Sequence, residues 1–311
     1  VTNAELAPWI MEMVEAVDCK IHHWQADGSN DPTMLAAADG FFVYGHPIID
    51  GAVMDSMSNL RVISNQGVGI DHIDLDAAKA RGIPVGNTPG FVDGATADMT
   101  FALLMATARH ILRGDHFARG PAFTHFDPNI LHGQEVFGAT LGIIGMGGVG
   151  QQVARRAAGF DMKVLYHNRS EIPEIAGKLG ATYVSLPELL AQSDFVTLNV
   201  PMSPETRNMI GRDELAMMKP TAILVNAARG GVLDHDALVD ALSDGTIWAA
   251  ALDVTEPEPL PRDHPLLAMG NIVIAPHLGS ATRKTRIGMV QRTIENLIAG
   301  LTGGEMPSRV A

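Results

Sequence analysis

The sequence predicts an α/β protein with two lobes, each built on a doubly wound parallel sheet. Short apolar runs alternate with helical patterns along most of the chain, as they do in βαβ units. In the second part of the chain these runs are continuously apolar, which is typical of parallel strands covered by helices on both faces. The length of 311 residues exceeds the usual size of one domain, so two domains are expected.

The first lobe is predicted to begin with an amphipathic helix over 5–17. Its strands are expected at 19–24, 41–44, 61–64 and 83–85. Residues 95–112 then have apolar positions at helical spacing, and this helix is long enough to cross between lobes. Residues 113–138 contain Gly, Pro, His and Phe without a clear period, so we expect an irregular excursion there.

The second lobe is predicted to start with the strongest strand of the chain, which leads into a helix over 149–160. Its strands are expected at 140–145, 163–166, 195–200, 222–225, 249–254 and 272–274. A last helix over 284–299 follows the final strand. It has no place in this sheet by sequence order, so it should pack elsewhere.

Composition excludes several classes of function. The net charge is −13, so the surface repels nucleic acid and anionic membranes, and any anionic ligand must be bound by specific arginines. No apolar run is long enough for a membrane span, and the first residues do not resemble a secretory signal. A single cysteine, Cys19, suits a reducing cytoplasm. No metal site is expected.

A glycine-rich turn follows the strand over 140–145. Residues 145–150 read Gly-Met-Gly-Gly-Val-Gly, and this pattern between a buried strand and a helix is typical of a dinucleotide site in a Rossmann domain. Gly145 permits the tight turn, Gly147 lets the backbone approach a pyrophosphate, and Gly150 allows close packing of helix on strand. A turn without a ligand is the less favoured alternative. Gly148 and Val149 complete the predicted loop.

The end of the next strand indicates which dinucleotide binds. NAD sites usually place Asp or Glu there for the ribose 2′-hydroxyl, whereas this chain has Asn168, Arg169 and Ser170. Arg169 can pair with a 2′-phosphate, and its neighbours can donate hydrogen bonds. NADPH is therefore favoured and NAD stays possible, while an uncommitted surface arginine is the alternative.

Three segments after later strands contain candidate catalytic residues: Arg229, the acid-rich stretch 253–259, and His277. Singly, each has an ordinary explanation as an ion pair, a solvated acid or a packing histidine. Together they suit carbonyl reduction, which needs a proton donor that titrates near neutrality, a carboxylate beside it, and a guanidinium for a substrate carboxylate. Ligands of open α/β sheets bind beyond the carboxyl ends of the strands, where these residues are expected.

Motifs along nearly the whole chain resemble the D-isomer-specific 2-hydroxyacid dehydrogenase family, most closely its glyoxylate/hydroxypyruvate reductase branch. The matching segments are Gly67 to Asp74, Asn87 to Gly90, Gly145 to Gly150, Asn226 to Gly230, Asp253 to Pro261, His264 to Leu267 and Pro276 to Thr282. The resemblance implies a Rossmann cofactor domain over 96–283, inserted in a flavodoxin-like substrate domain of residues 1–95 and 284–311. It also implies a homodimer, with 113–138 as a contact region.

The resemblance assigns roles by position. Arg229 would bind the substrate, Glu258 would be the carboxylate partner and His277 the acid/base, whereas Glu256 lies two positions short of the matching acid. The turn of Gly67, Val68 and Gly69 would offer backbone N–H groups to the substrate carboxylate. The other residues implied at the cofactor are Thr96, Val200, Pro201, Thr206, Ala227, Ala228, Asp253, His277 and Gly279. Tyr44 and His46 are candidates for substrate contact or for packing.

The implied reaction is reduction of a small 2-keto acid, of the glyoxylate or hydroxypyruvate class, to the D-2-hydroxy acid. Three alternatives stay open: a larger sugar acid such as 2-ketogluconate, D-3-phosphoglycerate, and a non-enzymatic dinucleotide sensor similar to transcriptional corepressors. Only Lys79 and Arg81 are candidates for a substrate phosphate in the first lobe.

Overall fold

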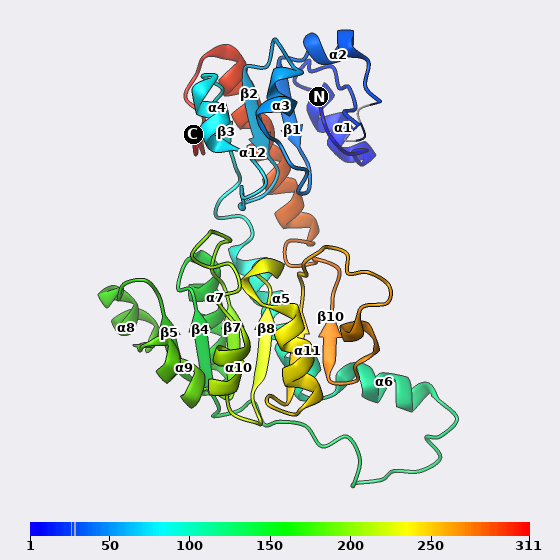
Figure 1. The fold of residues 1–311 in the computed structure, drawn as a ribbon, viewed down its shortest axis with the longest axis vertical. Coiled ribbons are helices and arrows are strands. Elements are labelled where there is room, and N and C mark those ends of the chain that lie inside the picture. Colours follow the sequence, from blue (N-terminus) through cyan, green and yellow to red (C-terminus); the bar gives the residue numbers. More distant parts are fainter. Residues whose placement is uncertain (26, 28) are drawn as a thin grey trace. The chain divides into compact units, whose positions relative to one another are not determined.

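The computed structural model describes residues 1–25, 27 and 29–311, and the chain forms two compact units (Figure 1). One unit combines Val1–Val92 with Thr282–Ala311, and the other spans Asp93–Ala281. The boundaries fall slightly before the positions expected from the sequence, because the long helix after the first unit already begins at Asp93. In the described residues no helix is long and apolar enough to cross a membrane.

The smaller unit has a parallel sheet in the order β1-β2-β3, made of β1 (Gly40–Val43), β2 (Val62–Asn65) and β3 (Val85–Gly86). Single bridges extend it, since Thr2 pairs with both Phe42 and His23. If the segments at Thr2 and His23 are counted as the first and second strands of the chain, the five strands lie in the order 2-1-3-4-5, which is flavodoxin-like. The predicted strand over 19–24 is wrong, because only His23 bridges and Trp24 alone in this segment is buried.

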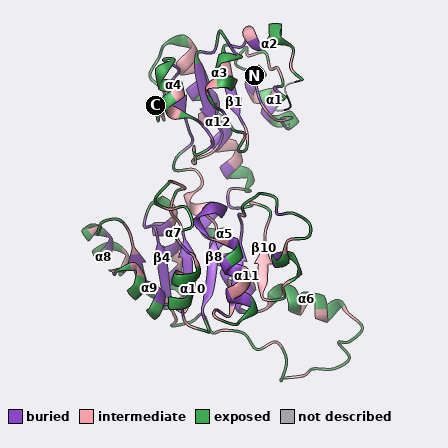
Figure 2. Ribbon diagram, viewed as in Figure 1, coloured by how far each residue is buried: buried purple, intermediate pink, exposed green. Residues whose placement is uncertain are grey.

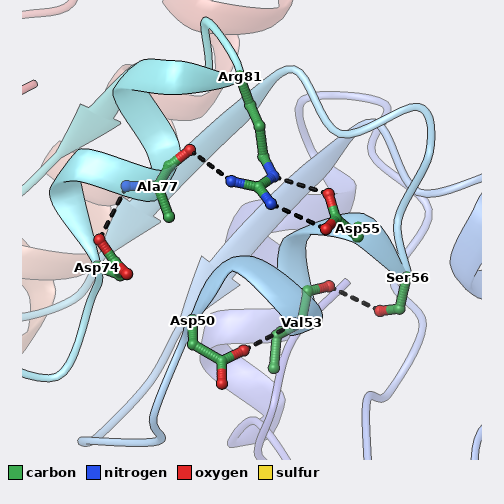
Figure 3. A network of polar contacts seen from close by, with 7 residues as sticks. All are labelled: Asp50, Val53, Asp55, Ser56, Asp74, Ala77 and Arg81. Carbon is green, nitrogen blue, oxygen red and sulfur yellow. Dashed lines mark hydrogen bonds and ion pairs between the residues drawn. The ribbon is translucent and has the colours of Figure 1, made fainter.

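The helices of this unit are α1 (Pro8–Glu15), α2 (Pro32–Ala36), α3 (Gly51–Asp55), α4 (Leu75–Ala80) and α12 (Arg283–Thr302). Asp50 and Asp74 cap α3 and α4 by accepting a backbone N–H, and Arg81 joins the two helices through Asp55 at 2.7 Å (Figure 3). The last helix, α12, contacts β1 and β2 and belongs to this unit, as its lack of a place in the larger sheet predicts.

The larger unit has a seven-stranded parallel sheet in the order β10-β9-β8-β7-β4-β5-β6. The strands are β4 (Thr140–Ile144), β5 (Lys163–His167), β6 (Thr182–Tyr183), β7 (Phe195–Leu198), β8 (Ile223–Asn226), β9 (Ala249–Leu252) and β10 (Ile272–Ile274). The order reverses between β4 and β7, so the sheet is doubly wound and ligands are expected at this switch point. The sequence missed β6, which has only two residues and pairs on one side.

Helices cover both faces of this sheet, and its central strands are buried (Figure 2). The helices of this unit are α5 (Asp93–Ala108), α6 (Ile111–Arg119), α7 (Gly148–Ala157), α8 (Pro173–Leu179), α9 (Leu186–Gln192), α10 (Arg212–Met217) and α11 (His235–Ser243). Short 3₁₀ helices lie at Ala158–Phe160, Gly230–Val232 and Pro265–Ala268. The predicted helix over 95–112 is interrupted at His110, whose φ of 51° is left-handed. The excursion expected to be irregular therefore begins with a helix, α6.

Candidate active site

The turn between β4 and α7 has the shape that its glycines predict. Gly145 has a φ of +96°, and a Cβ there would lie 2.7 Å from the carbonyl of Asn199. A Cβ on Gly150 would lie 2.1 Å from the Gly145 oxygen, so both positions require glycine. By contrast, no atom lies within 4 Å of a Cβ placed on Gly147. The turn is therefore packed from behind and open at Gly147, which fits a phosphate-bearing group.

The N-terminus of α7 adds electrostatic support for an anion. Gly147 is its N-cap and supplies no side-chain cap, so N–H groups of the first turn are available to a ligand. Beside it stands Asp93, whose carboxylate lies 2.4 Å from a Cβ placed on Gly148. Burial raises the pKa of the Asp93 carboxyl. Val149 follows, half-buried, in the same turn.

The segment after β5 places polar groups at the neighbouring strand end. Arg169 and Ser170 are exposed, while the carbonyl oxygen of Asn168 accepts a hydrogen bond from the Tyr183 hydroxyl at 3.2 Å. The pKa of Glu205 is lowered, chiefly by its hydrogen bond from Ser203 and in smaller part by the charge of Arg169. The sequence does not predict that Glu205 lies near Arg169, because the two residues are 36 positions apart and follow different strands.

The loop after β7 closes on itself next to the glycine turn. Thr206 Oγ1 donates to the carbonyl oxygen of Pro201 at 2.7 Å and accepts from the N–H of Ser203 at 2.8 Å. Val200 lies 2.8 Å from a Cβ placed on Gly145. Val200, Pro201 and Thr206 thus form one folded loop at the switch point of the sheet.

Asp253 joins the carboxyl ends of three strands. Its carboxylate accepts from the N–H groups of Leu278 and Gly279, both at 2.7 Å, and its carbonyl oxygen accepts from the N–H of His277 at 2.8 Å. Its own N–H donates to Asn226 at the end of β8. Asp253 is 1% exposed, so these bonds fix the 277–279 backbone. The family resemblance implies a place for Asp253 at the cofactor, and it does not imply these backbone contacts.

Thr96 of α5 also contacts this region. It is buried, and its side chain lies 3.3 Å from a Cβ placed on Gly279. A residue larger than glycine at 279 would therefore press on both Thr96 and Asp253.

His277 and Glu258 are hydrogen-bonded to each other at the end of the sheet. Nδ1 of His277 lies 2.6 Å from Oε1 of Glu258, and the side chains are 28% and 39% exposed. The φ of His277 is 58°, a left-handed conformation that non-glycine residues rarely adopt and that is enriched at functional sites. Nδ1 is thus the ring nitrogen that faces the carboxylate.

Arg229 is fixed by a buried asparagine that the sequence analysis did not single out. Asn226, with no exposed surface, donates from Nδ2 to the Arg229 carbonyl oxygen at 2.8 Å and accepts from the N–H of Ala228 at 3.0 Å. Arg229 Nη1 also donates to the Ala228 oxygen, and both Ala227 and Ala228 are half-buried. A Cβ on Gly230 would lie 2.1 Å from the Thr255 carbonyl, so this loop packs against the one that contains Glu258.

Glu256 has a different partner from Glu258. Its Oε1 pairs with Nη1 of Arg207 at 2.9 Å, and its Oε2 packs on Gly231. His277 is thus paired with the glutamate that the family resemblance selects.

The remaining candidates belong to the smaller unit. Gly67, Val68 and Gly69 form a partly exposed turn after β2. The ring of His46 lies edge-on to that of His72, with centroids 5.1 Å apart, and Tyr44 hydrogen-bonds through its backbone to Asn3.

Comparison with known proteins identifies the family. Residues 101–279 match the family model for the NAD-binding domain of the D-isomer-specific 2-hydroxyacid dehydrogenases. A glyoxylate reductase of Aeropyrum pernix is 45% identical over 277 residues, which cover 88% of this chain and 83% of that protein.

Solved structures agree over nearly the full length. A glyoxylate/hydroxypyruvate reductase from Sinorhizobium meliloti, NADPH-dependent and solved with NADP and malonate, has 30% identity and a TM-score of 0.88, covering 100% of this chain and 95% of its own. A D-lactate dehydrogenase from Aquifex aeolicus, solved with NAD and lactic acid, has 28% identity and a TM-score of 0.86, covering 95% and 92%. The expectation from the sequence motifs is confirmed: the chain belongs to the D-isomer-specific 2-hydroxyacid dehydrogenase family, and its relatives include proteins named glyoxylate reductase.

Proposed function

We propose that this protein reduces a small 2-keto acid, of the glyoxylate or hydroxypyruvate class, to the D-2-hydroxy acid with NADPH. The observation that carries the proposal is the pair of His277 and Glu258. It lies at the carboxyl ends of the strands, as the Gly145–Gly150 turn does, and Asp253 holds the 277–279 backbone there. The similarity to proteins named glyoxylate reductase supports the substrate class.

The bound nicotinamide would supply the hydride, and the protein would supply the proton and the binding groups. His277 donates a proton from Nε2 to the carbonyl oxygen as the alcohol forms. Glu258 accepts a hydrogen bond from Nδ1, which fixes the tautomer and stabilises the imidazolium. Arg229 binds the substrate carboxylate and polarises the keto group.

Preference for NADPH rests on the residues after β5. At this position many NAD-binding proteins have a carboxylate, which would repel a 2′-phosphate. This chain has Asn168, Arg169 and Ser170 instead, and Arg169 is a cation. Related structures bind either NADP or NAD, so the fold itself does not select the cofactor. The exposed Arg169 is the residue on which the preference should depend.

The larger unit would bind the cofactor and the smaller unit the substrate carboxylate, through the turn of Gly67, Val68 and Gly69.

We also propose a homodimer. The excursion over 113–138 and the two residues before it support the dimer, because apolar side chains there are exposed to solvent, which is unfavourable in an isolated chain. They are Ile111, Leu112, Phe123, Phe126, Ile130 and Phe137.

The test is a kinetic comparison of NADPH and NADH with glyoxylate, hydroxypyruvate, 2-ketogluconate and phosphohydroxypyruvate. The highest kcat/KM is expected for NADPH with one of the first two acids. Turnover confined to the sugar acid or the phosphorylated acid would overturn the substrate class, and no turnover with any acid would favour a dinucleotide sensor. Sedimentation velocity tests the dimer.

A further inference from the structure

The turn after β2 has its carbonyl groups held by one buried asparagine. Nδ2 of Asn65 donates to the oxygens of Gly67 and Gly69, at 3.2 and 2.8 Å. Asn65 is 1% exposed, and its Oδ1 accepts from Nε2 of His72 at 3.2 Å. Both ends of its amide are therefore engaged, which fixes the direction in which Nδ2 points.

A second asparagine holds the middle carbonyl. Nδ2 of Asn87 donates to the oxygen of Val68 at 2.8 Å, and the N–H of Thr88 donates to the oxygen of Gly67 at 3.0 Å. Asn87 is itself anchored, because its own carbonyl oxygen accepts from Asn296 of α12 at 3.0 Å and from Ser308 at 2.9 Å. The turn is thus connected to the last helix of the same unit.

Peptide geometry converts these contacts into a direction for the N–H groups. In a trans peptide the C=O of one residue and the N–H of the next point to opposite sides. Because the carbonyls of residues 67 and 68 point toward the two asparagines, the N–H groups of Val68 and Gly69 point away from them. Within the described residues neither N–H donates to a protein acceptor, and Val68 is 38% exposed.

We propose that Asn65 and Asn87 are positioning residues, which orient the N–H groups of Val68 and Gly69 to bind the carboxylate of the 2-keto acid. Successive backbone N–H groups of a turn can form a small concave anion site. This inference rests on the proposed function and adds to it two side chains that do not touch the substrate. If the side-chain amide of Asn65 or of Asn87 is removed, the peptide groups of the turn can rotate. The N–H groups of Val68 and Gly69 then no longer point at the carboxylate.

The experiment compares Asn65→Ala and Asn87→Ala with the wild-type enzyme. We measure kcat and KM for glyoxylate at saturating NADPH, the Ki of oxamate as a carboxylate inhibitor, and the Kd of NADPH by fluorescence. KM and Ki should rise together by about tenfold, the effect of one weakened hydrogen bond to a charged group. The kcat and the Kd of NADPH should stay within about twofold, because the dinucleotide would bind the other unit.

Asn3→Ala is the matched control, since Asn3 also bonds to the backbone of this unit twice, through Tyr44. It should leave KM and Ki unchanged. If Asn65→Ala does not fold, Asn87→Ala carries the test, because Asn87 is less buried. Unchanged KM and Ki in a folded variant would overturn the positioning role while wild-type turnover upholds the proposed function. Absence of wild-type turnover with every 2-keto acid would instead remove the proposed function, and this inference with it.

Discussion

Two glutamates on the loop after β9 lie two positions apart and bind different basic side chains. Oε1 of Glu258 faces Nδ1 of His277 at 2.6 Å, whereas Oε1 of Glu256 faces Nη1 of Arg207 at 2.9 Å. Their side chains are similarly exposed, at 39% and 45%, so exposure does not distinguish them. The partner does, because an imidazole can transfer a proton at neutral pH and a guanidinium cannot.

Two histidines near the same loop show the same contrast. His277 has a carboxylate partner and a left-handed backbone. His235, in the first turn of α11, is 8% exposed and donates from Nδ1 to the carbonyl oxygen of Leu233 at 3.1 Å. Burial lowers the pKa of His235, which favours its neutral form relative to a solvent-exposed histidine. Residue type alone thus does not identify the reactive group.

The largest effect is expected for His277→Ala. Loss of the proton donor should lower kcat with glyoxylate at least about a hundredfold, the scale of general acid catalysis. Steady-state NADPH oxidation measures it, and His235→Asn should retain kcat within a few-fold. Comparable losses in both variants would mean that the two histidines do not differ as proposed.

Glu258→Gln should have the next largest effect. The amide keeps the shape but removes the charge that stabilises the imidazolium, so kcat should fall roughly tenfold to a hundredfold. Glu256→Gln is the matched control, because an exposed pair such as Glu256–Arg207 contributes little. Equal kcat values in the two variants would refute the assignment of Glu258.

The sequence predicted the pair of His277 and Glu258 better than its surroundings. His277 and Glu258 were selected by their places in recognisable motifs, and these two side chains do meet. The contacts of Asn226, Asn65 and Glu205 are not predicted by the sequence. Asn226 and Asn65 bond to backbone groups two to four positions further along the chain, and this depends on loop conformations that have no periodic pattern. Glu205 lies near Arg169 through a contact between two loops that are far apart in the sequence.

Fold prediction succeeded and failed for equally physical reasons. Buried strands such as β4 and β8 are continuous apolar runs, and their positions were correct to within about a residue. The segment over 19–24 alternates plausibly but lies at an edge with one buried residue, so it forms only a bridge. The break at His110 depends on one backbone angle, which leaves no periodic signal.

A smaller effect is expected at the cofactor end of the molecule. Arg169→Ala should weaken NADPH binding by about tenfold, because one charge-assisted contact to the 2′-phosphate is lost, and should leave NADH binding nearly unchanged. Fluorescence titration with both dinucleotides measures the two Kd values. Glu205→Gln, which removes a carboxylate near Arg169, should shift NADPH affinity in the opposite direction. Parallel losses for both dinucleotides in Arg169→Ala would contradict a 2′-phosphate role.

The smallest effect concerns stability, and it separates His235 from His277 by the pH dependence of unfolding. Burial is the main cause that lowers the pKa of His235, and nearby His264 adds to it, while Leu233, Glu256 and Asp234 oppose it. The unfolded chain therefore binds a proton at higher pH than the folded chain does. Stability should decrease as the pH falls below about 6.5, the ordinary value for histidine, toward the lower pKa of the folded state.

Thermal unfolding of wild type and His235→Asn at pH 7.5, 6.5 and 5.5 measures this difference. The Tm of the wild type should decrease more steeply toward acid than that of the variant, since asparagine has no proton to gain. An equal slope would place the acid sensitivity in other groups, of which His110, whose pKa burial also lowers, is the next to substitute. His235 interacts with Glu256, whereas His277 interacts with Glu258. If His235→Asn reduces the decrease of Tm toward acid and leaves kcat unchanged, the two histidines have separate roles.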